Sequence, residues 1–200
     1  SPLGNIANID LGVPVYVNIE NGVAAMALAQ IAGVSAEDIR EGMRTFSGVE
    51  RRFDIKINTE KIVLISDYAH HPNELHALLE TARTMGYQRV ICAFQPHTYT
   101  RTKAFLPEFA KALSLADHVI LAKIYSAREA DIYGVSSADI QRLIAKEGTP
   151  CEYFESFPEI ESFIKDNCKE GDVVITMGAG NILEVGEDLL FPELSTVTAP

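Results

Sequence analysis

Residues 62–72 read IVLISDYAHHP, and this stretch decides the fold class. Its first four residues, 62–65, are apolar and predict a buried strand. Pro72 suits the first position of a helix, which we expect to continue to about Met85. The residues between strand and helix are mostly polar and predict a loop. A strand that leads through a short loop into a helix is the repeating unit of a parallel α/β sheet.

The same alternation continues to the end of the chain. Further strands are expected at 90–94, 119–122, 152–154 and 173–176, and further helices at 103 or 107 to 114, 137–146, 159–168 and 182–190. Upstream, residues 53–57 alternate in polarity and turn at 58–60 into the first apolar strand, which predicts a hairpin. We therefore predict a Rossmann-like α/β fold: a mostly parallel sheet with helices on both faces and an N-terminal β-hairpin.

The first 48 residues follow another pattern. An Ala-rich helix is expected over 21–32, and a second helix over 35–46 begins at the capping pattern of Ser35 and Asp38. Before them, residues 13–17 form a short β-prone run. The glycine-containing segment 47–50 predicts a domain boundary. The expected parts are a helical segment 1–48, an α/β domain 49–190, and a frayed tail 191–200.

Composition excludes several classes of protein. The 200 residues carry a net charge of −11, which would repel nucleic acid and anionic membranes, so neither is an expected partner. No apolar run approaches the roughly 18 residues that cross a bilayer, and no signal peptide is visible. Three widely spaced cysteines favour reduced thiols and a cytoplasmic location: Cys92, Cys151 and Cys168. The chain begins with Ser instead of Met, and we expect it to be a piece of a longer protein.

Polar residues follow four of the predicted strands, in segments 66–72, 95–103, 123–129 and 177–181. Ligands of parallel sheets bind beyond the carboxyl ends of the strands, so these segments should converge on one edge. Three histidines, two arginines and three tyrosines lie in them. The sequence therefore predicts a small-molecule site at this edge of the sheet.

Two of these segments favour an anionic ligand. His97, Arg101 and Lys103 gather positive charge in an acidic chain, and the planar fork of Arg suits a carboxylate. Gly178 and Gly180 let backbone N–H groups approach an anion ahead of a helix. No GxxxxGK[ST] phosphate loop occurs in the 200 residues, so this chain alone does not grip a triphosphate in that manner.

Simpler interpretations stay open for the same segments. Asp67 or His71 could merely cap the next helix, and the basic residues after the second strand could face solvent. A zinc site built from Asp67, His70, His71 and His97 is a further alternative. Adjacent histidines rarely bind one ion together, so we predict no protein-bound metal in this chain.

Four ordered motifs resemble those of the Mur ligase family of bacterial peptidoglycan synthesis. The motifs are FSGVERRF at 46–53, DYAHHP at 67–72, FQPHTYTRT at 94–102 and TMGAGN at 176–181. The resemblance covers about residues 13–190. It implies that the segment 1–48 ends a central ATP-binding domain and that 49–190 form the C-terminal Rossmann-like domain.

The resemblance also implies an ATP-dependent ligase. ATP and Mg²⁺, held mainly by the central domain, would activate the carboxylate of UDP-N-acetylmuramate as an acyl phosphate, which the amino group of L-alanine would attack. The partners would be these substrates and the rest of the same polypeptide, and the 200 residues alone would be inactive. Two alternatives stay open: a non-catalytic Rossmann-like ligand-binding module, and the related ligase that recycles muropeptides.

Roles for individual residues follow from the resemblance alone. The residues expected to contact the nucleotide are Asn18, Asn21, Arg51, Arg52 and Asp67. Those expected to face the catalytic cleft are Tyr68, His70 and His71. Those expected to bind the incoming amino acid are His97, Arg101 and Gly178. Thr98 stands where the family usually has Arg, so one expected cation is absent. Val17 stands where the family often has a His before the first Asn of the adenine-contacting pair.

Overall fold

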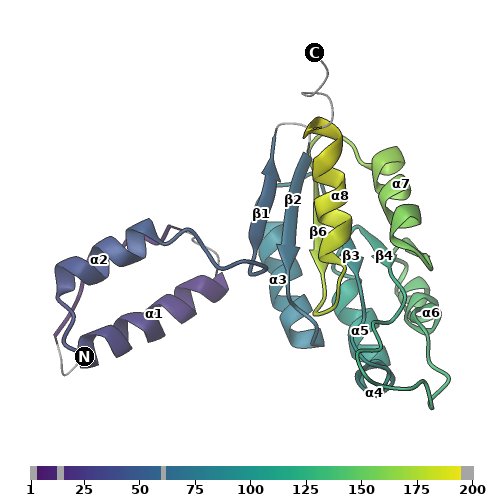
Figure 1. The fold of residues 1–200 in the computed structure, drawn as a ribbon, viewed down its shortest axis with the longest axis horizontal. Helices are drawn as coiled ribbons and strands as arrows, with labels where there is room; N and C mark the ends of the chain where they lie inside the picture. Colours follow the sequence, from purple (N-terminus) through teal and green to yellow (C-terminus); the bar gives the residue numbers. More distant parts are fainter. Residues whose placement is uncertain (1–3, 13–15, 60–61, 195–200) are drawn as a thin grey trace. The chain divides into compact units, whose positions relative to one another are not determined.

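The computed structural model describes residues 4–12, 16–59 and 62–194 (Figure 1). These residues form two compact units, and the division falls between Glu50 and Arg51. Each unit is described by itself below.

The first unit contains two helices, α1 (Tyr16–Ile31) and α2 (Ala36–Thr45). The predicted cap of α2 is confirmed, because the Ser35 hydroxyl accepts a hydrogen bond from the Asp38 amide at 3.1 Å. Helix α1 begins at Tyr16, so the β-prone prediction is wrong for residues 16–17, where helical neighbours override a weak intrinsic preference. The other positions of that run, 13–15, lie outside the described residues.

The second unit is built on a six-stranded sheet in the order β1-β2-β6-β3-β4-β5. Its strands are β1 (Asp54–Asn58), β2 (Ile62–Asp67), β3 (Arg89–Phe94), β4 (His118–Leu121), β5 (Cys151–Tyr153) and β6 (Asp172–Met177). Strand β1 pairs antiparallel with β2, and the register shifts between Ile55 and Ile57. The neighbouring pairs from β2 to β5 are parallel, so the predicted mostly parallel sheet with an initial hairpin is confirmed.

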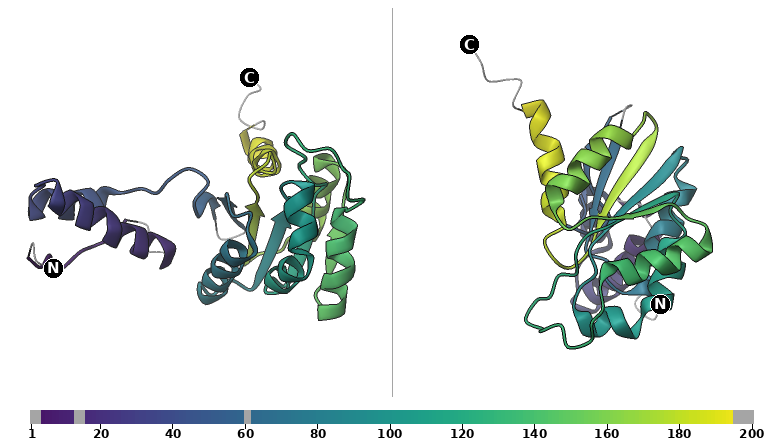
Figure 2. Two further views of the ribbon diagram at one scale, coloured as in Figure 1. Left: turned by 90° about the horizontal axis from the view of Figure 1, so that it is seen from below. Right: turned by 90° about the vertical axis from the view of Figure 1, so that its right-hand side faces the viewer.

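Helices cover both faces of this sheet (Figure 2). They are α3 (Pro72–Thr84), α4 (Tyr99–Ala104), α5 (Leu106–Leu113), α6 (Ser137–Glu147), α7 (Phe157–Asn167) and α8 (Leu183–Leu194). Helices α7 and α8 lie on one face, and α3, α5 and α6 lie on the other. The predicted covering of the sheet on both faces is therefore confirmed.

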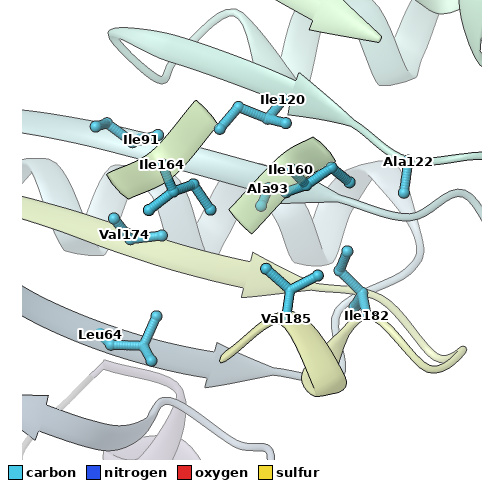
Figure 3. Packing of buried hydrophobic residues seen from close by; sticks show 10 residues of the cluster. All are labelled: Leu64, Ile91, Ala93, Ile120, Ala122, Ile160, Ile164, Val174, Ile182 and Val185. Atoms are coloured by element: carbon cyan, nitrogen blue, oxygen red, sulfur yellow. The ribbon is translucent and has the colours of Figure 1, made fainter. Parts of the chain in front are cut away.

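The core explains why the strands read as continuous apolar runs. Leu64, Val174 and Ile91 come from three neighbouring strands and pack with Ile164 of α7 and Val185 of α8 (Figure 3). Alternate residues of the same strands point to the opposite face, where other helices lie. Because both faces are covered, the central strands alternate between two apolar layers instead of between core and solvent.

Two predictions of irregular structure are wrong. Residues 99–104 form α4, because Thr98 turns the chain and its hydroxyl accepts a hydrogen bond from the Arg101 amide. Helix α8 runs to Leu194, so the first four residues of the expected tail, 191–194, are helical. The remainder of the expected tail, 195–200, lies outside the described residues.

No helix within the described ranges has both the length and the apolar character needed to cross a membrane.

Candidate active site

The carboxyl ends of β2, β6 and β3 lie side by side at one edge of the sheet, at the bottom of the unit in Figure 1. Backbone hydrogen bonds join the loops that follow them. The Gly178 amide donates to the Asp67 carbonyl at 3.2 Å, and the Gln95 amide donates to the Met177 carbonyl at 3.0 Å. The predicted convergence of these strand ends on a single edge is therefore confirmed.

Asp67 is a buried carboxylate at the end of β2, with 6% of the residue exposed. Its Oδ2 accepts a hydrogen bond from the Phe53 amide and its Oδ1 one from the Ala69 amide, each at 2.7 Å. Burial raises the pKa of Asp67, although these two amides and the nearby Arg52 act in the opposite direction. Asp67 thus fixes the start of the unit to the loop after β2, while each oxygen keeps a further lone pair.

Tyr68 lies beside two guanidinium groups. The Cζ atom of Arg51 is 4.7 Å from the centre of the Tyr68 ring, and that of Arg52 is 5.7 Å from it. Arg51 Nη2 also donates to the Gly178 carbonyl at 2.5 Å and to the Gly180 carbonyl at 3.0 Å. Arg52 is exposed. The structure therefore brings all three predicted residues to the site, with the two arginines in different surroundings.

The adjacent residues His70 and His71 also differ. His70 Nδ1 lies 3.0 Å from the Tyr68 carbonyl oxygen, which only accepts, so Nδ1 carries the proton and Nε2 of the neutral ring is an acceptor. His71 Nδ1 accepts a hydrogen bond from the Asn73 amide at 3.3 Å and caps α3, and its ring packs edge-on against Phe105. The predicted alternative in which His71 caps this helix is confirmed.

His97 connects the loops after β3 and β4. Its ring stacks on Tyr125, with centroids 5.4 Å apart, and lies 6.1 Å from the His70 ring. Burial lowers the pKa of His97, and the neighbouring Arg101 and His70 lower it further. Its Nδ1 atom is buried and has no hydrogen-bond partner among the described residues. His97 is thus disposed to stay neutral and carries an unused polar atom.

Arg101 presents a second unused atom. Its Nη1 is buried and, within the part of the chain that the structure describes, makes no hydrogen bond. Helix α4 carries Arg101 and begins after Thr98, whose φ of +67° lies in a region that favours glycine. Lys103 is exposed, so the solvent-facing interpretation holds for this cation. Of the three residues of the predicted positive cluster, His97 and Arg101 therefore lie at the site, and Arg101 supplies its positive charge.

Positions 178 and 180 leave no room for a side chain, because neighbouring atoms lie too close to the backbone. A Cβ atom on Gly178 would lie 2.8 Å from the Gln95 carbonyl oxygen, and its φ is +151°. A Cβ atom on Gly180 would lie 2.3 Å from Gln95 Oε1 and 2.7 Å from Tyr125 Cγ. Glycine at these positions lets the loop after β6 pack directly against the loops after β3 and β4.

Gln95 and Tyr125 are residues of this edge that the sequence analysis did not single out. Gln95 is 4% exposed, and its Nε2 donates to Asn181 Oδ1 at 3.1 Å while its Oε1 accepts from the Ile182 amide at 3.2 Å. The Tyr125 carbonyl accepts from the Thr98 amide at 2.8 Å. A polar residue directly after an apolar strand was the available signal for Gln95, but its partners are distant in sequence.

Asn18 and Asn21 belong to the first unit. They lie three residues apart in α1, so they share one face of that helix. Asn18 is 7% exposed and Asn21 is exposed. The edge described above consists of residues of the second unit.

The structure gives no fit for a metal ion in the described residues. None of their His, Cys, Asp and Glu side chains form a group of three or more that could hold one. Asp67 already accepts two backbone hydrogen bonds. No chemical step is therefore assigned to Mg²⁺ at this edge.

Comparison with known proteins places the second unit in a family. The sequence profile described as "Mur ligase, glutamate ligase domain" matches residues 51–180. The UDP-N-acetylmuramate–L-alanine ligase of Agathobacter rectalis is 49% identical over 183 residues, which cover 92% of this chain and 40% of that protein. The protein of the same name from Caldanaerobacter subterraneus is 45% identical over 185 residues, again 92% and 40% of the two chains. This chain thus spans about 40% of the length of these curated relatives.

Solved structures agree with this placement. The UDP-N-acetylmuramate–alanine ligase of Thermotoga maritima superposes with a TM-score of 0.78 at 30% identity, over 94% of this chain and 40% of that one. A murein peptide ligase of Psychrobacter arcticus gives a TM-score of 0.65 at 21% identity, over 96% and 40% of the chains, which shows a shared fold alone. Because the family profile matches more than half of the residues, the chain belongs to the Mur ligase family.

Proposed function

We propose that this chain is the C-terminal part of an ATP-dependent ligase that joins L-alanine to UDP-N-acetylmuramate in peptidoglycan synthesis. Relatives of that name, up to 49% identical, support the reaction class. In the proposed reaction the amino nitrogen of L-alanine attacks the carbonyl carbon of an acyl phosphate. The C–N bond forms, the bond from that carbon to the phosphate oxygen breaks, and inorganic phosphate leaves.

One observation at the site carries the amino-acid half of this proposal. His97 Nδ1 and Arg101 Nη1 are buried polar atoms without a hydrogen-bond partner among the described residues. The two side chains are close enough for Arg101 to lower the pKa of His97. Buried polar atoms are rarely left unsatisfied in folded proteins. The carboxylate of L-alanine would accept hydrogen bonds from both and would be held between them.

His70 is the proposed proton acceptor. The ammonium group of L-alanine must lose a proton before its nitrogen can attack. The hydrogen bond from His70 Nδ1 to the Tyr68 carbonyl keeps the Nε2 lone pair of the neutral ring available for that proton. The His70 ring lies 6.1 Å from that of His97, so both would face one bound amino acid. Tyr68 would position His70, and His71 would stabilise the helix behind it.

The proposed nucleotide contacts are residues of both units, each considered by itself. Arg52 is exposed beside Tyr68 and is the proposed phosphate contact in this unit. Asp67 would bind the ribose through its remaining lone pairs, and Asn18 and Asn21 would contact adenine. ATP and Mg²⁺ would be held mainly by parts of the ligase that this chain does not match. The free cysteines Cys92, Cys151 and Cys168 support the proposed cytoplasmic location.

A hybrid enzyme tests this function. In it, this chain replaces the matching 40% of the Agathobacter rectalis relative. We expect phosphate release that requires ATP, UDP-N-acetylmuramate and L-alanine together, with the alanyl product seen by mass spectrometry. The unmodified relative is the positive control, and the 200-residue chain alone should release no phosphate.

Two results would contradict the proposal. A folded hybrid that uses a muropeptide and ignores L-alanine would identify the recycling ligase instead. A folded hybrid that binds amino acid without consuming ATP would identify a non-catalytic binding module. Circular dichroism and the melting temperature establish that the hybrid is folded in either case.

A further inference from the structure

Arg51 is the first residue of the second unit, and its backbone is fixed there on both sides. Its amide donates to Asp54 Oδ2 at 3.2 Å, and its carbonyl accepts from the Tyr68 amide at 2.8 Å. Its φ is +58°, a left-handed conformation that non-glycine residues seldom adopt. These hydrogen bonds hold the residue in an orientation that sends its side chain across the site.

The side chain ends on the glycine loop, residues 178–181. Arg51 Nη2 donates to the carbonyls of Gly178 and Gly180, at 2.5 and 3.0 Å. The guanidinium carbon also lies 4.7 Å from the centre of the Tyr68 ring. Hydrogen bonds from a charged donor are stronger than neutral ones, and the aromatic face adds a cation–π attraction. The guanidinium therefore binds two separate segments of the site.

Gln95 also holds the glycine loop, at its C-terminal end. The Gln95 side chain donates to Asn181 Oδ1 and accepts from the Ile182 amide, at 3.1 and 3.2 Å. The absence of a Cβ atom at Gly180 makes room for the Gln95 and Tyr125 side chains. Arg51 thus binds backbone carbonyls of the loop, and Gln95 binds its last residue and the residue after it.

The hydrogen bonds from Arg51 set the direction of two backbone N–H groups in the glycine loop. In a trans peptide the C=O and the following N–H point in opposite directions. Because Arg51 draws the carbonyls of Gly178 and Gly180 toward itself, the N–H groups of Ala179 and Asn181 point away from it. The orientation of the loop that we propose to line the substrate site therefore depends on Arg51.

We infer that Arg51 is a positioning residue for the glycine loop and that Arg52 alone of the pair contacts the nucleotide. Arg51 Nε is buried and has no hydrogen-bond partner among the described residues, but a guanidinium that moved to a phosphate would abandon both carbonyls and the Tyr68 ring. Arg52 is exposed, and its 5.7 Å contact with Tyr68 leaves it able to reach a ligand. The inference rests on the proposed function for the identity of the ligands, whereas the contacts of Arg51 do not depend on it.

Hydrogen exchange in the 200-residue chain tests the positioning role without any activity. The probes are the amides of Gly178 and Ile182, which donate to the Asp67 carbonyl and to Gln95 Oε1. Loss of a charged hydrogen bond corresponds to a factor of about ten. We therefore expect Arg51→Met to speed exchange at both amides by about tenfold and Arg51→Lys to restore part of the protection. The matched control Arg52→Met should leave both rates unchanged.

Kinetics of the hybrid ligase supply the second readout. Arg51→Met should raise the KM for L-alanine or lower kcat and leave the KM for ATP unchanged, whereas Arg52→Met should raise the KM for ATP. A tenfold rise in the KM for ATP in Arg51→Met, with wild-type exchange at Gly178 and Ile182, would overturn the inference. If Arg51→Met does not fold, the exchange rates and the KM values are compared with those of Arg51→Lys instead. An inactive hybrid would defeat the proposed function, and the exchange rates would still decide the role of Arg51.

Discussion

The imidazole of His97 stacks on the ring of Tyr125 at an angle of 24°, in the loop contact that joins the ends of β3 and β4. Burial in this contact, together with Arg101 and His70, lowers the pKa of His97 from its ordinary value of 6.5. Below pH 6.5 the unfolded chain then binds more protons at this residue than the folded chain does. Stability therefore rises with pH in this window and is complete above it.

We accordingly expect the chain to lose stability as the pH falls below 6.5, and His97→Gln to weaken this dependence. Urea unfolding followed by circular dichroism between pH 5 and pH 8 measures the effect. His76→Gln, which changes an exposed histidine on α3, is the control and should keep the wild-type dependence. Equal pH dependence of stability in the His97→Gln and wild-type chains would show that His97 has the same pKa in the folded and unfolded states.

Arg101→Ala should weaken the use of L-alanine by the hybrid ligase by about 1.5–3 kcal/mol, the size of a hydrogen bond to a charged group. The reason is the buried Nη1 atom, which has no partner among the described residues and which we assign to the substrate carboxylate. The measurement is kcat/KM for L-alanine at saturating ATP. Lys103→Ala removes an exposed cation from the same helix and should leave kcat/KM unchanged. A similar loss in both variants would indicate a general effect of charge and would remove Arg101 from the binding site.

Asp67→Asn should lower the free energy of unfolding by about 1–3 kcal/mol. Both carboxylate oxygens accept backbone amides, so the new NH₂ group would confront the N–H of Phe53 or of Ala69. Urea denaturation at pH 7 gives the value. The same substitution at the exposed Asp166 of α7 is the control. An Asp67→Asn chain as stable as this control would mean that the two hydrogen bonds contribute little.

Gly180→Ala should destabilise the second unit by about 1–3 kcal/mol, the usual cost of overpacking. Its methyl group would overlap the side chains of Gln95 and Tyr125. Gly186→Ala provides a matched control in α8, where a Cβ atom would make an ordinary 3.5 Å contact with Leu64. That change should stabilise the helix by about 0.5–1 kcal/mol. Melting temperatures of the two variants should therefore move in opposite directions from the wild-type value.

The sequence predicted the architecture because its signals were local. Apolar runs such as 62–65 become strands buried on both faces, and Ser35 and His71 cap helices that begin next to them in the chain. Helix α4 was missed because its start depends on the backbone of Thr98, which has a φ of +67° and donates its amide to the Tyr125 carbonyl in a distant loop. Nothing in the residue types of 97–103 reveals that conformation.

The location of the site was also predictable, because strand ends of a parallel sheet share one edge. Asp67, His97 and Gly178 meet there as expected. The sequence could not distinguish neighbours with similar side chains. Contacts across the fold, which no local pattern encodes, bind Arg51 to the glycine loop and leave Arg52 exposed.

The irregular pairing of β1 has a consequence for association between molecules. This strand forms one edge of the sheet, and its register shift between Ile55 and Ile57 places Lys56 at the interruption. A foreign strand that approached this edge would meet a break in the hydrogen-bonding ladder and the charged pair of Lys56 and Asp54. At the opposite edge, β5 offers only three residues for pairing. Both margins of the sheet therefore discourage fibril growth and aggregation by strand addition.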